Sequence, residues 1–151
     1  MKSDSRTIHL SLRGHKRSLS SRRPEDTNRF AGQLVKELHG GDVLALQGNL
    51  GAGKTTFTQF LAKELGIKEQ ITSPTFVLMK LYTLPVSTNG ITRLCHIDAY
   101  RLESSDELEA IGAQEYIGSP DTLSLIEWPE KVQGSVPKNA IWISFELGGN
   151  V

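Results

Sequence analysis

The alternation of apolar and polar residues divides the N-terminal part of the chain into three segments. Residues 7–12, TIHLSL, alternate between apolar and polar positions, as expected of a strand with one buried face. Residues 13–23 are polar and basic, and we interpret them as a loop, although Leu19 would also fit a strand. Residues 24–39 begin with proline and two acidic residues and then repeat apolar residues at helical spacing. We therefore expect a helix there, which ends at the two glycines that follow.

The central part of the chain predicts a strand, a glycine-rich loop and a helix in direct succession. Residues 43–46 are a short apolar run of the kind found in buried strands. Residues 48–55 read GNLGAGKT, and residues 57–65 then place apolar side chains at helical spacing before Gly66. Glycines let such a loop bring its N–H groups against phosphate oxygens, and the dipole of the following helix favours an anion there.

This loop matches the pattern G-x-x-x-x-G-K-[ST], which binds nucleoside triphosphates together with Mg²⁺. Lys54 is then expected to reach the β- and γ-phosphates, and the Thr55 hydroxyl to bind Mg²⁺. The alternative is a glycine-rich turn with a surface lysine, and the flanking strand and helix argue against it. The other residues expected around the phosphates are Gly48, Asn49, Leu50, Gly51, Ala52, Gly53 and Thr56.

The segment after the second helix predicts an antiparallel pair of strands. Residues 75–84 and 91–97 are rich in β-branched and apolar residues. Residues 85–90 run from a proline to an Asn-Gly pair, which is a strong turn signal, so we interpret them as the turn. We expect this pair of strands to lie beside the strand of residues 43–46.

The C-terminal third of the chain predicts one further helix and two strands. Ser104 and Glu107 have the spacing of a capping box, so a helix is expected to follow Ser104 and to end at residues 118–120. Residues 122–126 and 140–147 are apolar runs that indicate short strands. The length of 151 residues fits a single domain with a buried core.

Two acidic residues are candidates for the metal and catalytic chemistry that a phosphate-binding loop needs. Asp98 ends the apolar run 94–97, and Glu127 ends the run 123–126. An acid at the end of a buried strand points at the phosphate loop if its strand lies beside the strand of the loop. The alternative for each residue is a strand-end carboxylate that caps a turn or makes a surface salt bridge.

Three further residues near these acids have open interpretations. Thr75 follows a Ser-Pro pair, at a place where many phosphate-loop proteins have a segment that senses the γ-phosphate; alternatively, Pro74 simply begins a strand. His96 shares a strand face with Asp98, and we interpret it as a buried residue beside the site rather than as a base. Trp128 either covers the site, anchors a partner or is an ordinary packed residue.

Several classes of protein are disfavoured by what the chain lacks. It has no [NT]-K-x-D segment to read guanine, no LSGGQ signature of transport ATPases, and little room for the arginine-rich lid of small-molecule kinases. Its single cysteine, Cys95, rules out an internal disulfide and fits an inert core thiol in a reducing compartment. No membrane helix or secretory signal is visible, so we expect a cytoplasmic protein with no membrane partner.

Charge is unevenly distributed although the net formal charge is zero. Residues 1–23 contain seven Lys and Arg residues against Asp4 alone, and the rest of the chain is correspondingly acidic. A basic segment of this kind contacts RNA or an acidic partner, is a solvated tail, or is an organellar transit peptide. We expect residues 1–14 to form a basic extension, either disordered or an extra strand, and residues 15–151 to form the phosphate-loop domain.

Taken together, the motifs resemble those of the TsaE (YjeE) family, the small ATPases of bacterial tRNA threonylcarbamoyladenosine synthesis. The loop and acidic motifs occur in family order over roughly residues 20–146. The matching segments are PEDT at 24–27, GNLGAGKTT at 48–56, SPTF at 73–76, HIDAYRL at 96–102, ELEAIG at 107–112 and IEWPE at 126–130. SPTF, HIDAYRL and IEWPE in this order make the resemblance more specific than the phosphate loop alone.

The resemblance implies an α/β fold like that of P-loop NTPases, with parallel core strands flanked by antiparallel strands and helices on the faces. It implies Mg²⁺-ATP binding, slow hydrolysis, and association with the TsaD–TsaB pair, which modifies adenosine-37 of tRNA. Lys54 would hold phosphates, Thr55 and Glu127 would serve Mg²⁺, and Asp98 would be a catalytic or metal-linked acid. Thr75 would lie on a switch-like loop with a catalytic role, Thr27 near the nucleoside, and Trp128 directly after the metal acid.

The chain also departs from the family pattern. Asn49 stands where the family commonly has Asp, residues 1–14 have no recognised counterpart, and family members usually continue beyond the position of Val151 into a basic segment and strand. Two other functions stay open: a nucleotide-dependent binding switch with negligible hydrolysis, and a small-molecule phosphotransferase.

Overall fold

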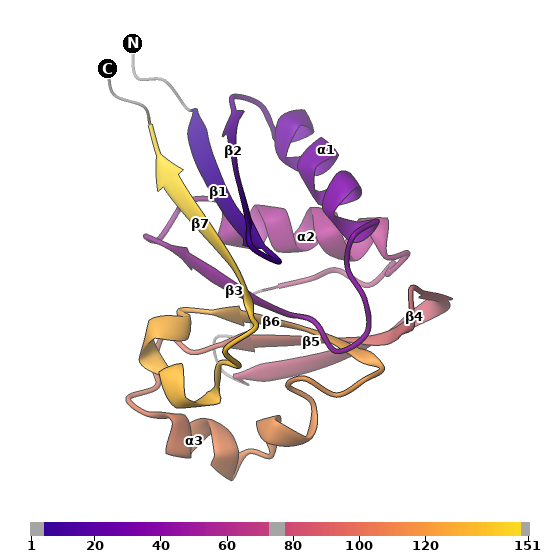
Figure 1. Ribbon diagram of the computed structural model, residues 1–151, viewed down its shortest axis with the longest axis vertical. Coiled ribbons are helices and arrows are strands. Elements are labelled where there is room, and N and C mark those ends of the chain that lie inside the picture. The colour runs from indigo at the N-terminus through magenta and orange to yellow at the C-terminus, as the bar shows by residue number, and fades with distance from the viewer. Residues whose placement is uncertain (1–4, 73–77, 149–151) are drawn as a thin grey trace.

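The computed structural model describes residues 5–72 and 78–148, whose seven strands form one sheet (Figure 1). The strands are β1 (Arg6–Leu12), β2 (His15–Ser21), β3 (Val43–Gly48), β4 (Met79–Thr88), β5 (Ile91–Asp98), β6 (Thr122–Glu127) and β7 (Ile141–Leu147). The helices are α1 (Pro24–Val35), α2 (Lys54–Glu64) and α3 (Ser105–Ala110), with short 3₁₀ turns η1 (Ala113–Glu115), η2 (Pro129–Lys131) and η3 (Gln133–Ser135). None of the helices in the described ranges is long and apolar enough to cross a membrane.

The sheet has a parallel centre and antiparallel edges. Its strand order is β2-β1-β7-β3-β6-β5-β4, and β7, β3, β6 and β5 run parallel to one another. The β1–β2 hairpin adds antiparallel strands at one edge, and β4 adds one at the other. The α/β fold of the P-loop NTPase type that the resemblance implies is therefore confirmed.

The two faces of the sheet carry separate apolar cores because successive strand residues point to opposite faces. Leu44 and Leu46 of β3 pack with Phe57 and Leu61 of α2 in the larger core. The smaller core lies on the other face of the sheet, where Leu108 of α3 packs with apolar residues of β5 and β6. Figure 1 shows α1 and α2 on one side of the sheet and α3 with the 3₁₀ turns on the other.

Strand β2 contradicts the interpretation of residues 13–23 as a loop. The pairing Leu12↔His15 leaves Arg13 and Gly14 as a two-residue turn, and both have positive φ angles, 46° and 82°. Such a turn suits a tight hairpin. The sequence signal is weak because β2 is an edge strand with a mostly exposed, polar surface, held by backbone pairing with β1.

The β4–β5 pair confirms the predicted antiparallel hairpin but corrects two of its details. β4 continues through Pro85 to Thr88, so residues 85–88 are not part of the turn, and only Asn89 and Gly90 form it. The proline is tolerated because β4 is an edge strand whose register shifts between Thr83 and Thr88. The pair also does not lie directly beside β3, because β6 lies between them.

Helices α1 and α3 are shorter than the sequence predicts. α1 begins at Pro24 as predicted but ends at Val35, because the chain turns there toward β3. α3 follows Ser104 as predicted but ends at Ala110, and Gly112 at φ 81° leads into the separate turn η1. Elements α2, β6 and β7 lie where the apolar runs predict them.

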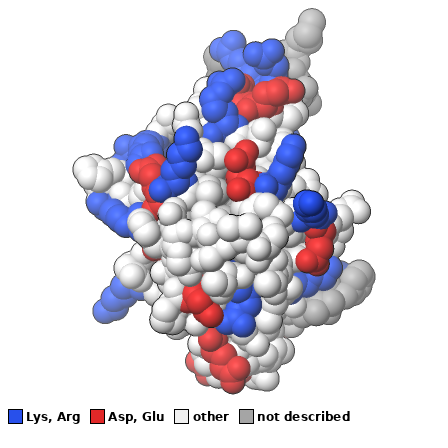
Figure 2. Space-filling view, turned by 90° about the vertical axis from the view of Figure 1, so that its right-hand side faces the viewer, with Lys and Arg blue, Asp and Glu red and all other residues white. Residues whose placement is uncertain are grey.

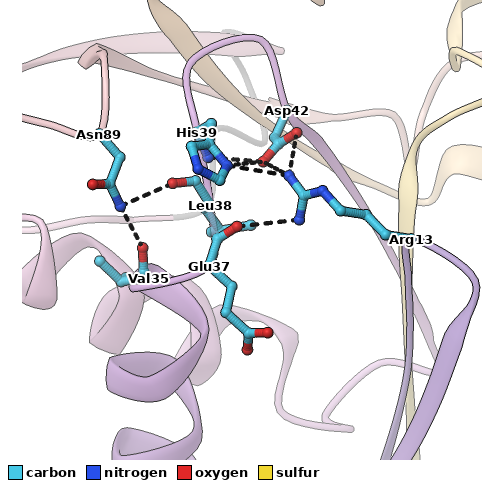
Figure 3. A network of polar contacts seen from close by, with 7 residues as sticks. All are labelled: Arg13, Val35, Glu37, Leu38, His39, Asp42 and Asn89. Atoms are coloured by element: carbon cyan, nitrogen blue, oxygen red, sulfur yellow. Dashed lines mark hydrogen bonds and ion pairs between the residues drawn. The ribbon is translucent and has the colours of Figure 1, made fainter.

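Polar contacts join the sheet edge to the loop that leads into β3 (Figure 3). Arg13, in the β1–β2 turn, donates to the Asp42 carboxylate at 3.0 Å and to the Glu37 carbonyl at 3.1 Å. Arg17 of β2 forms a second ion pair with Glu37 at 2.6 Å. Basic residues of the N-terminal segment thus pair with acidic residues of the body, and Figure 2 shows basic and acidic side chains close together on one face.

Candidate nucleotide-binding site

A cleft of about 290 Å³ opens where the parallel strands β3, β5 and β6 end. Ligands of open α/β sheets bind at this end of the strands. The phosphate loop contributes Leu50, Gly51, Gly53, Lys54, Thr55 and Thr56 to its lining. The strand-end residues Asp98, Glu127 and Trp128 line it as well, so the structure brings most of the predicted site residues together.

The glycines of the loop are required by its geometry. Gly48 has a φ of 150°, and a Cβ there would lie 2.8 Å from the carbonyl oxygen of Phe145. Gly53 has a φ of 109° and directly precedes Lys54, the first residue of α2. A side chain at either position would push the loop away from β7 or strain its backbone. The loop therefore presents the N-terminus of α2 to the cleft, where an anion is favoured.

Lys54 is almost completely buried, with 5% of its surface exposed. Its Nζ donates to the Gly48 carbonyl at 2.5 Å and lies 3.6 Å from the centre of the Trp128 ring. Burial lowers the pKa of Lys54, whereas the charges of Glu127, Glu130 and Asp98 act in the opposite direction. The ammonium group is thus held at the base of the cleft, close to the acids.

The two candidate acids lie side by side. Asp98 pairs with Glu127 in the parallel register of β5 and β6, and Glu127 pairs with Leu46 of β3. Both residues are buried, at 7% and 3% exposure, and Glu127 pairs with the buried side chain of His96. Asp98 does cap a turn, since its Oδ1 accepts a hydrogen bond from the Tyr100 N–H at 3.0 Å. Both carboxylates nevertheless line the cleft that contains Lys54.

His96 holds the carboxylate of Glu127. It is fully buried, as predicted, and its Nε2 lies 2.6 Å from Glu127 Oε2. Its Nδ1 has no hydrogen-bond partner among the described residues. A proton on Nε2 satisfies this arrangement, because it lets the ring donate to Glu127 and leaves no unpaired N–H group. Glu127 Oε1 does not take part in this contact.

Trp128 and Tyr100 form an aromatic wall of the cleft. Trp128 follows β6 in the left-handed conformation, with φ 59° and ψ 50°. This conformation is uncommon for a bulky residue and is held here by packing. Its ring contacts the Tyr100 ring, with centroids 5.0 Å apart, and faces Lys54. Of the predicted alternatives, the structure supports a residue that borders the site.

Some predicted site residues do not line this cleft. Thr27 lies on α1, 6% exposed, and its hydroxyl is hydrogen-bonded to Ser21 Oγ at 2.7 Å. Gly48, Asn49 and Ala52 shape the loop but are not part of the cleft wall. Thr75, with the whole SPTF segment, lies outside the described residues, so its role stays a prediction.

The residues present fit a hydrated Mg²⁺ ion bound together with a nucleotide. No group of three or more His, Cys, Asp or Glu side chains in the described ranges is arranged to hold a metal by itself. Mg²⁺ is commonly held by one or two protein oxygens, by phosphate and by water. The Thr55 hydroxyl and the Glu127 carboxylate, which share this cleft, provide such oxygens.

Three further lining residues are not among the site residues predicted from the sequence. Tyr100 and Arg101 belong to the HIDAYRL segment, so their place in a motif was a usable signal. Arg6 comes from β1, outside every recognised motif, and nothing in the sequence distinguishes it from the other basic residues near the N-terminus.

Comparisons with known proteins place these features in a family. Residues 21–150 match the family model described as threonylcarbamoyl adenosine biosynthesis protein TsaE. The TsaE protein of Treponema pallidum is 41% identical over 127 residues, which are 84% of this chain and 89% of that protein. TsaE of Bacillus subtilis is 38% identical over 127 residues, 84% of this chain and 75% of that protein.

A solved structure agrees with the sequence comparisons. The crystal structure of YdiB from Bacillus subtilis superposes with a TM-score of 0.68 at 28% sequence identity. The match covers 96% of this chain and 79% of the YdiB chain. The fold of the relative therefore extends over almost the whole molecule, including the sheet that positions the cleft.

Proposed function

The chain belongs to the TsaE family of threonylcarbamoyl adenosine biosynthesis proteins, and from this premise we propose that it is a Mg²⁺-dependent ATPase of tRNA modification. In this role it binds and hydrolyses ATP while the cytoplasmic machinery forms N6-threonylcarbamoyladenosine at adenosine-37. The observation that carries the proposal is the cleft that joins the phosphate loop, Lys54, Asp98 and Glu127.

The phosphate loop, Lys54 and the two acids of the cleft have defined tasks in this proposal. The loop N–H groups and Lys54 bind the phosphates and neutralise the charge that develops during transfer. Thr55 and Glu127 hold Mg²⁺, which supplies further charge stabilisation at the phosphates. Asp98, one strand further from β3, orients the attacking water. Thr75 contributes from the segment after α2, and Thr27 lies toward the nucleoside.

The tRNA chemistry itself belongs to partners. We propose that the chain acts with the TsaD–TsaB pair and meets tRNA through that complex. In this proposal, turnover by the isolated chain is slow and rises with the partner pair. The ammonium group of Lys54 has two internal contacts, the Gly48 carbonyl and the Trp128 ring, with which phosphates have to compete.

Measurements of ATP binding and turnover distinguish two other functions from this one. A binding switch would hold ATP tightly without turnover, and a phosphotransferase would consume ATP in response to a small metabolite. The cleft is lined by the phosphate loop, Lys54 and the strand-end acids, which would serve an ATPase or a switch equally well. A response of ATP consumption to the partner pair rather than to a metabolite would disfavour a phosphotransferase.

The test is ATP turnover with and without TsaD–TsaB, using wild type, Lys54→Ala and Glu127→Ala. We expect turnover to rise with the pair and to fall on the order of a hundredfold in both variants. Glu115→Ala is the matched control, because Glu115 is an exposed acid that does not line the cleft. Turnover that ignores the pair would contradict the role in tRNA modification, and an active Glu127→Ala would place the metal at another acid.

A further inference from the structure

Arg6 extends the cleft from a part of the chain that has no counterpart in the family motifs. It is the first residue of β1, which pairs with β7 so that Arg6 lies opposite Leu147. Strand β7 in turn pairs with β3, where Phe145 lies opposite Gly48 of the phosphate loop. The start of β1 therefore reaches the same edge of the sheet at which β3 ends, and Figure 1 shows β1 beside β7 there.

The Arg6 side chain lies directly against the phosphate loop. A Cβ built on Gly53 would be 3.0 Å from Arg6 Cδ and 3.1 Å from Arg6 Nε. Gly53 immediately precedes α2, so the guanidinium group is next to the helix end that attracts phosphate. The lack of a side chain at Gly53 is what makes room for Arg6 in this position.

The guanidinium group has no partner within the described part of the chain. The Arg6 Nε–H group is buried and donates to no acceptor among the described residues, and no ion pair of Arg6 is present there. A buried charged donor without an acceptor is costly, and arginine matches phosphate oxygens through paired N–H groups. An anionic ligand in the cleft would satisfy this group.

The sheet order indicates which part of a nucleotide Arg6 would meet. The acids lie on β6 and β5, on one side of β3, whereas Arg6 lies on β1, on the other side. Mg²⁺ and the γ-phosphate belong with the acids and Lys54. Arg6 is therefore on the side of the α-phosphate and the nucleoside. Its neighbour across the β1–β2 pair is Ser21, which contacts Thr27.

We propose that Arg6 is a nucleotide-binding residue that contacts the α-phosphate end of ATP or ADP. The proposal rests on the nucleotide-binding function proposed above and adds a residue to that site. The family model begins at residue 21, so Arg6 lies outside the segment that the family model describes. The first strand thus supplies a ligand contact as well as an edge to the sheet.

The test is the affinity of the full chain for ADP and for a non-hydrolysable ATP analogue in Arg6→Gln. We expect both dissociation constants to rise about 10- to 100-fold, because one charge-assisted contact is lost. The Mg²⁺ dependence of ATP-analogue binding should stay unchanged. Arg6→Lys keeps the charge but not the paired N–H geometry, so it should recover part of the affinity. Arg22→Gln is the matched control, an exposed arginine of the same hairpin end.

The outcomes separate this inference from the function on which it rests. If wild type binds neither nucleotide, the proposed function is wrong. If wild type binds and Arg6→Gln binds equally well, the function stands and the Arg6 contact is wrong. An equal loss in Arg22→Gln would show a general effect of charge and contradict a direct contact, and a loss confined to the ATP analogue would contradict the α-phosphate position. Thermal unfolding without ligand identifies a folding defect in Arg6→Gln. In that case the affinity of Arg6→Lys decides whether the Arg6 contact exists, because partial affinity is expected there if it does.

Discussion

Lys54 shows at the residue scale how burial and charge are balanced in the cleft. Its ammonium group lies between the Gly48 carbonyl and the Trp128 ring, with Glu127 and Asp98 close by. Burial is the largest influence on its pKa and lowers it, while the acids partly offset that effect. In the proposed function, Lys54 binds phosphate in its protonated form, so the expected affinity for nucleotide depends on this balance.

Nucleotide affinity is expected to fall at alkaline pH, because burial lowers the pKa of Lys54 below the usual value for lysine. The sign follows from protonation: below the lowered pKa, Lys54 is charged and binds phosphate, and above it the charge is lost. Affinity should then decrease by up to about tenfold per pH unit. Titrations with ADP between neutral and alkaline pH measure this decline. Lys54→Met, which has no ammonium group, should bind weakly and show no such decline, and a parallel decline in that variant would assign the effect to another group.

His96 is expected to position Glu127 for Mg²⁺, since Nε2 and Oε2 are 2.6 Å apart in a buried site. His96→Leu removes the donor, and the Mg²⁺ concentration for half-maximal ATP turnover should rise about 10- to 100-fold. His96→Gln retains an N–H donor and should shift the Mg²⁺ requirement less. A magnesium titration measures both variants. If His96→Leu keeps the wild-type Mg²⁺ requirement, the contact between His96 and Glu127 supports the fold and does not position Glu127 for the metal.

The sequence predicted the main charged residues of the site but not all of the residues that line it. Lys54, Asp98 and Glu127 could be predicted because a loop motif and the acids at strand ends are visible in the local sequence. The direct contact of His96 with Glu127 depends on the register between β5 and β6, which no local pattern reveals. Arg6 reaches the cleft through the pairing of β1 with β7, across most of the chain length, so its sequence neighbours give no indication.

At the scale of elements, the position of a strand in the sheet determines how well the sequence pattern predicts it. Buried strands such as β3 and β6 are continuous apolar runs and were predicted in place. The edge strands β2 and β4 have mixed, partly exposed patterns, so the first was interpreted as a loop and the second was ended early at Pro85. Backbone pairing with a neighbour defines both strands at the positions where their side chains are exposed.

The β4–β5 turn also stabilises the end of α1. Asn89 Nδ2 donates to the carbonyls of Leu38 at 3.1 Å and Val35 at 3.4 Å, as Figure 3 shows. Asn89 has a φ of 50°, which asparagine tolerates better than most residues. Asn89→Ala loses both the contacts and the backbone preference, so it should lower the free energy of unfolding by about 1–2 kcal/mol.

Chemical denaturation measures this loss, and Asn89→Gly separates its two causes. Glycine keeps the positive φ and loses the side-chain contacts alone. A similar destabilisation in both variants would assign the effect to the hydrogen bonds. Wild-type stability in Asn89→Ala would contradict a stabilising role for the connection.

At the scale of the whole molecule, the β1–β2 hairpin completes the edge of the sheet. The apolar face of β1, with Ile8, Leu10 and Leu12 almost fully buried, belongs to the core under α1 and α2. The alternation of apolar and polar residues indicated this strand, but alternation does not identify the strand with which it pairs. Its partner β7 is more than a hundred residues away in the chain.

Leu10→Ala is expected to destabilise the whole domain by about 2–4 kcal/mol, because it leaves a cavity in the core. Ser11→Ala, on the opposite face of the same strand, should change stability by less than about 0.5 kcal/mol. Thermal and chemical unfolding measure both variants. Unfolding of Leu10→Ala at wild-type stability would indicate that residues 1–14 are the separable extension that the sequence predicts, whereas cooperative destabilisation would make β1 part of the domain.

In the proposed function, this α/β domain as a whole couples ATP hydrolysis to the threonylcarbamoylation of tRNA. The most direct test is formation of N6-threonylcarbamoyladenosine over many turnovers, with TsaD–TsaB, substrate tRNA and ATP. The account predicts sustained product formation with wild type and loss of it with Lys54→Ala, which removes the phosphate-binding ammonium group. Equal product formation without the chain, or with Lys54→Ala, would contradict its role as the ATP-dependent component.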